Sequence, residues 1–144
     1  MKKWTIFIYI LLVIVVGMSI TVMRQELNYK QASWINGTPK LYHVGRTVVR
    51  AVFEVDSAAA IYWRVYQVDA PEPKLSDFTN INLESFEGLT AYGGSFSQGS
   101  NNSYTNLADG LLPCTDYILY SVAISYIGPF RGKIKRVPFR TKNG

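Results

Sequence analysis

The sequence predicts an all-β domain, built as a sandwich or barrel of short strands, that follows one transmembrane α-helix. Three observations lead to this prediction. An uncharged apolar run spans residues 4–23 of the 144-residue chain. From residue 47 onward, apolar side chains recur at every second position in short runs that Gly, Pro, Asn and Ser separate. Aromatic residues make up 14% of the chain and include ten Tyr, a residue that favours pleated strands.

The first predicted element is a membrane anchor. The segment from Trp4 to Met23 contains no charged residue, and a helix of that length rises about 30 Å, which matches the hydrocarbon core of a bilayer. Lys2 and Lys3 precede it, and because Lys and Arg are enriched on the cytoplasmic side, residues 1–3 are predicted to stay in the cytoplasm. The protein is then single-pass in the plasma (cytoplasmic) membrane, with its C-terminal domain extracytoplasmic.

A cleaved signal peptide is the alternative for this segment. Lys2 and Lys3 would form its basic region, and Gly17-Met18-Ser19 offers small residues to a signal peptidase. The chain stays apolar as far as Met23, where a signal peptide normally turns polar, so the uncleaved anchor is favoured. If residues 1–19 are removed, the domain is secreted, and both alternatives export it.

The next elements are a stalk and two strands. Residues 24–44 are mixed and polar and predict a juxtamembrane stalk, with a turn signal at Asn36-Gly37-Thr38-Pro39. The period-two pattern predicts one strand over residues 47–55 and another over residues 61–68. The second of these strands carries Ile61, Trp63 and Val65 on one face and Tyr62, Arg64 and Tyr66 on the other.

The rest of the chain is a mixture of ambiguous and clear segments. Residues 74–87 are compatible with a short helical turn or with the start of a strand. Residues 88–109 are rich in Gly, Ser and Asn and predict a hairpin with a flexible tip at 98–102. The clearest strand covers residues 117–126, and a Gly-Pro turn separates it from a last strand over residues 133–141.

Several of these segments resemble the fibronectin type III family. Leu111-Leu112-Pro113-Cys114-Thr115-Asp116-Tyr117 is similar to the family's Leu-x-Pro-x-Thr-x-Tyr motif, and Phe139-Arg140-Thr141 is similar to its final Phe-x-Thr. The segment from Ile61 to Tyr66 looks like strand C. The resemblance implies a seven-stranded, immunoglobulin-like β-sandwich over residues 45–144. It also implies that Tyr117 is the tyrosine corner, whose hydroxyl bonds to backbone a few residues upstream.

The resemblance to that family is weaker in the first third of the domain and in residues 88–106. The usual Trp of strand B is absent, and residues 88–106 are longer and richer in Gly than is usual. These departures leave the strand boundaries open, while the fold class rests on the corner motif and the final strand.

No pattern in the chain points to catalysis or to a metal. The single His43 and the single Cys114 lie far apart in the sequence, and no known catalytic motif surrounds either residue. Asp69, Glu72 and Asp77 are close in sequence but lack the alternating spacing of a calcium loop. We therefore expect a non-enzymatic protein without a metal or a cofactor.

Charge is distributed unevenly along the chain. The net charge is +5, and beyond Asp116 the sequence contains six basic residues and no acid. A basic end suggests contact with an anionic surface such as phospholipid headgroups, an acidic polymer or an acidic partner. Lys and Arg that protect a strand edge from aggregation would produce the same pattern. Nucleic acid is not expected as a partner, because the predicted anchor exports the domain.

The strand over residues 117–126 leads to the functional prediction. If Tyr117 and every second residue after it face the core, the alternate set faces outward, and that set is apolar. In the fibronectin type III family, strand C lies beside this strand, so the outward residues of both would form one patch. Apolar patches mark interfaces, and Tyr and Arg are enriched at their hot spots. The residues predicted to bind a partner are Tyr62, Arg64, Tyr66, Ile118, Tyr120, Val122, Ile124, Phe130 and Arg131.

The expected function is therefore that of a membrane-anchored interaction protein. It would dock on another envelope protein, or serve as accessory subunit of a membrane or surface complex, through this face. The alternative is a module for an anionic polymer or carbohydrate at the cell surface, with residues 131–142 supplying charge and Tyr62, Tyr66 or Phe130 supplying stacking platforms. The outward apolar residues are also compatible with strand propensity alone, or with a face that residues 88–106 fold over and cover.

Overall fold

A computed structural model describes residues 13–14, 31–79, 86–97, 103–126 and 132–143. Val13 and Ile14 are α-helical, and within this described part of the chain no helix is long and apolar enough to cross a bilayer. The rest of the predicted anchor lies outside the described residues, as do Phe130, Arg131 and the predicted tip at 98–102. The anchor and the segments at 1–3 and 24–30 that flank it stay predictions.

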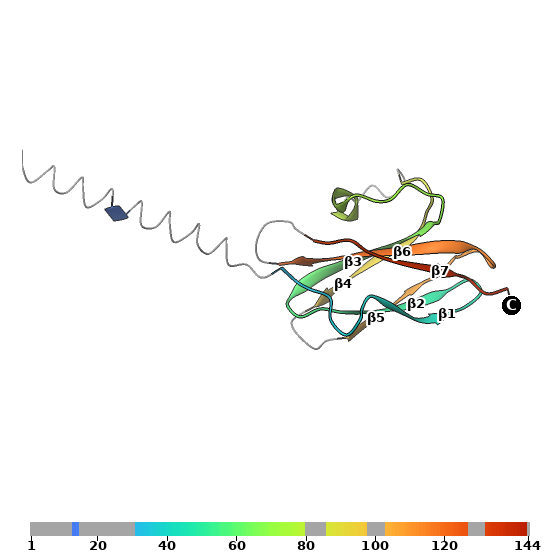
Figure 1. The fold of residues 1–144 in the computed structure, drawn as a ribbon, viewed down its shortest axis with the longest axis horizontal. Coiled ribbons are helices and arrows are strands. Elements are labelled where there is room, and N and C mark those ends of the chain that lie inside the picture. The colour runs from blue at the N-terminus through green and yellow to red at the C-terminus, as the bar shows by residue number, and fades with distance from the viewer. Residues whose placement is uncertain (1–12, 15–30, 80–85, 98–102, 127–131, 144) are drawn as a thin grey trace, which may run out of the picture. The chain divides into compact units, whose positions relative to one another are not determined.

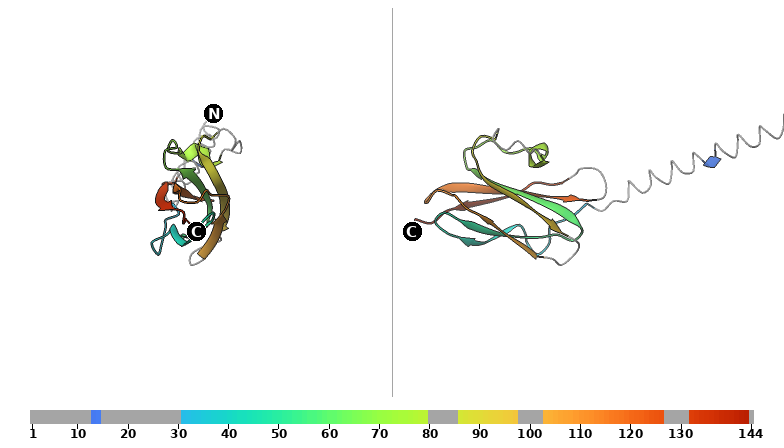
Figure 2. Two further views of the ribbon diagram at one scale, coloured as in Figure 1. Left: turned by 90° about the vertical axis from the view of Figure 1, so that its right-hand side faces the viewer. Right: turned by 180° about the vertical axis from the view of Figure 1, so that it is seen from behind.

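The chain from residue 31 onward forms two antiparallel sheets that pack face to face (Figure 1, Figure 2). One sheet has the strand order β1-β2-β5, and the other has the order β4-β3-β6-β7. The strands are β1 Lys40–Val44, β2 Val49–Glu54, β3 Ala59–Gln67, β4 Leu89–Ser97, β5 Ser103–Ala108, β6 Asp116–Ser125 and β7 Lys135–Arg140. The prediction of an all-β domain with several short strands is confirmed.

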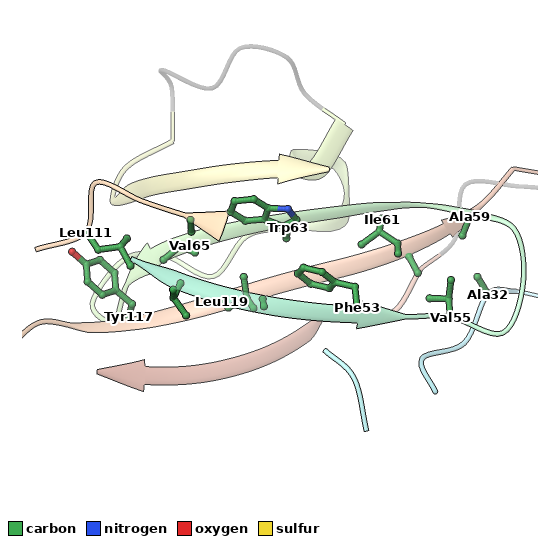
Figure 3. Close-up of a cluster of buried hydrophobic side chains, with 14 residues drawn as sticks. Ala32, Phe53, Val55, Ala59, Ile61, Trp63, Val65, Leu111, Tyr117 and Leu119 are labelled. Atoms are coloured by element: carbon green, nitrogen blue, oxygen red, sulfur yellow. The ribbon is translucent and has the colours of Figure 1, made fainter. Parts of the chain in front are cut away.

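The main core lies between the two sheets. The alternate residues of β2 and β3 that the sequence pattern assigned to one face point into this core, together with Leu119 of β6 (Figure 3). Burying such side chains contributes roughly 1.5–3 kcal/mol each, so the period-two pattern fixes which face of each strand turns inward. The buried members of the core are Ala32, Val49, Ala51, Phe53, Val55, Ala59, Ile61, Trp63, Val65, Ala108, Leu111, Tyr117, Leu119 and Ala123.

The segment before residue 45 belongs to the sandwich, so the predicted stalk is wrong from residue 31 onward. Lys40–Val44 is β1, and Trp34 forms a β-bridge with Val55. The Trp34 ring packs on Phe53 with a centroid distance of 6.1 Å. Widely spaced apolar residues in this polar stretch thus pack against the core. The polarity of the local sequence does not reveal such tertiary packing.

The segment from residue 88 to residue 109 is not a hairpin within one sheet. β4 pairs with β3, whereas β5 pairs with β2 in the opposite sheet. The two strands lie side by side across the sandwich, where the Asn106 side-chain amide donates a hydrogen bond of 2.7 Å to Ser95 Oγ. β4 and β5 therefore belong to different sheets, an arrangement that the Gly- and Ser-rich composition cannot distinguish from a hairpin.

Candidate functional site

The predicted docking residues that the structure describes do share one face. This face, called the outer face here, is the side of the four-stranded sheet that is turned away from the three-stranded sheet. The register of β3 and β6 sets Tyr62 beside Val122, Arg64 beside Tyr120, and Tyr66 beside Ile118. The alternation read from the sequence therefore places these side chains correctly relative to the main core.

The prediction that these residues are exposed is wrong for most of them. Tyr120 is 3% exposed and Val122 is fully buried, and Tyr62 alone remains partly accessible. The buried residues predicted to be a docking surface are Arg64, Tyr66, Ile118, Tyr120, Val122 and Ile124. All of these except Arg64 form a second apolar cluster, which includes side chains from the chain's own connection between β3 and β4.

A short 3-10 helix, η1 (Leu75–Thr79), covers this part of the outer face (Figure 1). Phe78 is 3% exposed and packs into the second cluster, and Leu75 and Phe86 pack against it. Most of the covering residues lie before β4; Leu89 from the 88–106 stretch, which the sequence left open as a cover, and Ile134 before β7 also pack against the cluster. A surface of Tyr, Ile and Val this large would be costly to leave in water, and the chain removes it from solvent itself.

Arg64 holds this cover in place. One of its terminal nitrogens, Nη2, donates a hydrogen bond to the Asp77 backbone carbonyl. Its guanidinium lies 4.5 Å from the centroid of the Phe86 ring and 5.6 Å from that of Phe78, and such cation–π contacts stabilise by roughly 0.5–2 kcal/mol each. Arg64 therefore stabilises the folded chain and is not presented to a partner.

Beyond this cover, aromatic side chains remain exposed on the same sheet. Phe96 is 67% exposed, Tyr92 is 58% exposed and Tyr126 is 51% exposed. The pairing of Arg64 with Tyr92 and of Ala60 with Phe96 puts both β4 residues on the outer face. Together with the partly buried Tyr62, these three residues form the aromatic patch. It contains one of the nine residues that the sequence predicted as partner-binding.

Two members of the aromatic patch are arranged against each other. The rings of Phe96 and Tyr126 stack with a centroid distance of 6.2 Å and an interplanar angle of 22°. The pKa of the Tyr126 phenol is raised, first by desolvation and then by the nearby phenols of Tyr62 and Tyr104. Tyr126 therefore stays uncharged to a higher pH than an ordinary tyrosine, and the patch is suited to apolar contact and hydrogen bonding.

The basic residues near the C-terminus lie on and beside β7. Lys133, Lys135 and Arg136 are exposed, and Arg136 pairs with Tyr120 on the outer face. Arg140 forms an ion pair with Asp116, with 2.5 Å between Nη1 and Oδ2. Because that pair is exposed, it contributes little to stability, but it leaves Arg140 less available to an anionic ligand.

The β4 half of the aromatic patch was missed from the sequence. Tyr92 and Phe96 lie in a Gly- and Ser-rich stretch that indicates a flexible connection. The signal that identifies them is a short alternation in which Tyr92, Gly94 and Phe96 occupy one face of a strand. Among the described residues, no three His, Cys, Asp or Glu side chains gather in a way that could hold a metal ion.

Comparison with known proteins reveals similarity at the level of structure only. No protein-family model and no curated protein matches the chain. The PhoD structure has a TM-score of 0.46 at 14% identity and covers 70% of this chain, which spans 18% of the PhoD chain. A myokine structure has a TM-score of 0.49 at 13% identity and covers 78% of this chain and 99% of its own. A computationally redesigned β-sandwich protein has a TM-score of 0.43 at 13% identity, with coverages of 79% and 91%. At these TM-scores, nothing about this chain's activity follows from the three.

Proposed function

We propose that this protein is a non-enzymatic interaction module, anchored in the membrane by residues 4–23, with an extracytoplasmic sandwich that docks on another envelope protein. The aromatic patch is the docking surface. This moves the contact from the centre of the outer face, which η1 covers, to the part of that face that remains in solvent.

Two features support assignment of the sandwich to the fibronectin type III class. The Tyr117 hydroxyl accepts a hydrogen bond of 2.9 Å from the Leu112 backbone N–H, five residues upstream, which is the contact that defines a tyrosine corner. The two sheets contain three and four strands, and the strand that follows this corner, β6, lies between β3 and β7. Modules of this class bind or space other domains, and a site must still be argued from its own residues.

The observation that carries the proposal is the exposure of stacked aromatic rings on a sheet whose other apolar residues are covered. The chain buries Tyr66, Tyr120 and Ile124 under its own cover, yet Phe96 stays 67% exposed. Tyr and Phe are enriched at protein interfaces, where a rigid aromatic side chain buries a large area at low entropic cost. An uncovered aromatic cluster beside a covered one fits a surface that a partner completes.

A module for an anionic polymer or carbohydrate is the second candidate. The stacked rings of Phe96 and Tyr126 offer a flat platform, and Lys135 and Arg136 are exposed on the same sheet. Tyr66 cannot act as a stacking platform because it is 2% exposed. High salt separates the two candidates, since screening weakens charge-led binding much more than packed apolar contact.

The experiment compares Phe96→Glu with Leu107→Glu in the full chain. Phe96 and Leu107 are both exposed, on opposite sheets of the sandwich, so each variant adds one surface charge without disturbing the core. After crosslinking in the native membrane, proteins captured by the wild type are identified. Loss of the captured envelope protein is expected with Phe96→Glu, and its retention is expected with Leu107→Glu. Full retention with Phe96→Glu would show that the aromatic patch is not the docking surface.

A further inference from the structure

The two lateral sides of the sandwich differ in their charge. On one side β1 lies beside β7, and on the other β4 lies beside β5. The β1 and β7 strands contain Lys40, His43, Lys135, Arg136 and Arg140, whereas β4 and β5 contain no charged residue. Natural sheets protect their edges with Lys, Pro, bulges and short strands, so the uncharged side is the one that can accept another strand.

β4 is the longer of the two uncharged edges. It contains nine residues, and within the described part of the chain it pairs on one side only, with β3. The corresponding edge at the far end of the same sheet, β7, has six residues and includes Pro138 and three basic side chains. β1 is short and carries an irregularity between Leu41 and His43. The edge of β4 has neither a charge nor a proline to block pairing.

The sequence of β4 is also self-complementary about Gly94. In an antiparallel pair of two identical strands centred on Gly94, residue 92 of one copy lies opposite residue 96 of the other. Both residues are aromatic, both point to the outer face, and both are exposed. Residues directly opposite in an antiparallel pair have Cβ atoms about 4.5–5.5 Å apart, and aromatic pairs at such positions stabilise the pairing.

We propose that β4 pairs antiparallel with β4 of a second copy of this chain, in the register that centres on Gly94. The two outer sheets join into one continuous sheet across a two-fold axis, which is the isologous arrangement of most homodimers. Tyr92 of each copy contacts Phe96 of the other, and the stacking of Tyr126 on Phe96 orients that ring in advance. This inference rests on the proposed function, because it takes the aromatic patch as a docking surface and identifies its partner.

A charge-pair experiment tests the register. The full chain is purified in detergent, and its dissociation constant is measured by sedimentation for Tyr92→Lys/Phe96→Lys and for Tyr92→Glu/Phe96→Lys. Both variants remove the same two rings, but the first sets two like-charged pairs opposite each other and the second sets two opposite-charged pairs. We expect the first to weaken dimerisation by about tenfold or more and the second to dimerise measurably better than the first. Equal dissociation constants for the two variants, or a wild type that stays monomeric, would overturn the proposal.

Cysteine crosslinking provides an independent test that keeps one ring in each copy. In a Cys114→Ser background, chains with Tyr92→Cys are mixed with differently tagged chains that carry Phe96→Cys, and both are oxidised in membranes. The mixed pair is expected to form a disulfide, because its cysteines lie directly opposite. Two Tyr92→Cys chains should not, because in this register their cysteines are about 13 Å apart along the strands. Equal crosslinking in both mixtures, or none in the mixed pair, would contradict the register.

These outcomes are distinguishable from failure of the proposed function. A foreign envelope protein that binds the aromatic patch would be lost with both lysine-containing variants, because both lack the rings. Pairing of two copies through β4 requires instead that the opposite-charged variant dimerise measurably better than the like-charged one. If crosslinking in the native membrane captures a different protein at Phe96 and the chain itself is monomeric, the aromatic patch is a docking surface and the second copy is not its occupant.

Discussion

Two buried tyrosines on opposite faces of the four-stranded sheet differ in what their hydroxyl groups do. The Tyr117 hydroxyl accepts the Leu112 backbone N–H at 2.9 Å. The Tyr66 hydroxyl is buried and has no hydrogen-bond partner among the residues that the structure describes. A satisfied hydrogen bond contributes about 1 kcal/mol to stability, whereas a buried polar group without a partner costs roughly 1–3 kcal/mol.

The two positions therefore predict opposite results for the same substitution. Tyr117→Phe removes the acceptor of the Leu112 N–H and is expected to lower the free energy of unfolding by about 1 kcal/mol. Tyr66→Phe removes an unpaired hydroxyl from the second apolar cluster and is expected to leave that free energy unchanged or to raise it. Urea denaturation of both variants measures the difference. Equal losses at the two positions would show that the corner hydrogen bond contributes nothing specific.

At the scale of elements, η1 determines what the outer face can do. Phe78 is the buried residue of this helix, and Arg64 lies beneath it with its guanidinium near the Phe78 ring. Removing a buried Phe ring costs about 3–5 kcal/mol where the site cannot collapse. If the cover detaches locally, the sandwich survives and cluster side chains such as Tyr66 and Tyr120 become accessible.

Phe78→Ala is therefore expected to lower the thermal unfolding temperature and to increase the binding of a hydrophobic dye. Ser76→Ala, an exposed change in the same helix, is the matched control and is expected to do neither. Dye fluorescence below the unfolding transition separates local detachment from global unfolding. Unchanged dye binding and unfolding temperature in Phe78→Ala would mean that this ring does not hold the cover on the sheet.

The elements that the sequence predicted are those whose pattern is local. β2, β3, β6 and β7 follow from alternation or from an apolar run between turn signals, because their inner faces meet the core directly. The cover does not follow, since Phe78 and Phe86 reach the sheet only through tertiary contacts. In β6 every residue from Tyr117 to Ile124 is buried, and a near-continuous apolar run is typical of a strand buried on both faces. Alternation alone identifies two faces and does not say whether the second one is covered.

The same limit explains why most of the predicted docking residues are buried. Tyr120 and Ile124 are on the face that the pattern assigned, but the sequence could not reveal which segment lies over them. Tyr92 and Phe96 are absent from the predicted site, because Gly93 and Gly94 between them indicate a loop by composition. Here Gly93 has a structural reason, since a Cβ at this position would lie 2.5 Å from the Trp63 ring. The Trp63 ring lies so close to β4 that only glycine fits at residue 93, although glycine in a sequence is usually taken as a sign of flexibility.

At the scale of the whole molecule, the proposed function depends on the side of the membrane where the sandwich lies. Lys2 and Lys3 at the N-terminal flank of residues 4–23 predict an extracytoplasmic sandwich. The chain contains a single cysteine, Cys114, and it is exposed in the folded sandwich. One native thiol therefore reports the location of the domain without any added label site.

A membrane-impermeant maleimide is expected to label Cys114 in intact spheroplasts that express the full chain. A Cys114→Ser variant, which contains no thiol at all, is expected to give no signal, and detergent lysis is expected to add little to the wild-type signal. The exposed side chain makes this measurement direct, because labelling requires no unfolding of the sandwich. Labelling that occurs only after lysis would place the sandwich in the cytoplasm. In that case the two lysines do not orient the chain, and neither an envelope protein nor a surface polymer could be its partner.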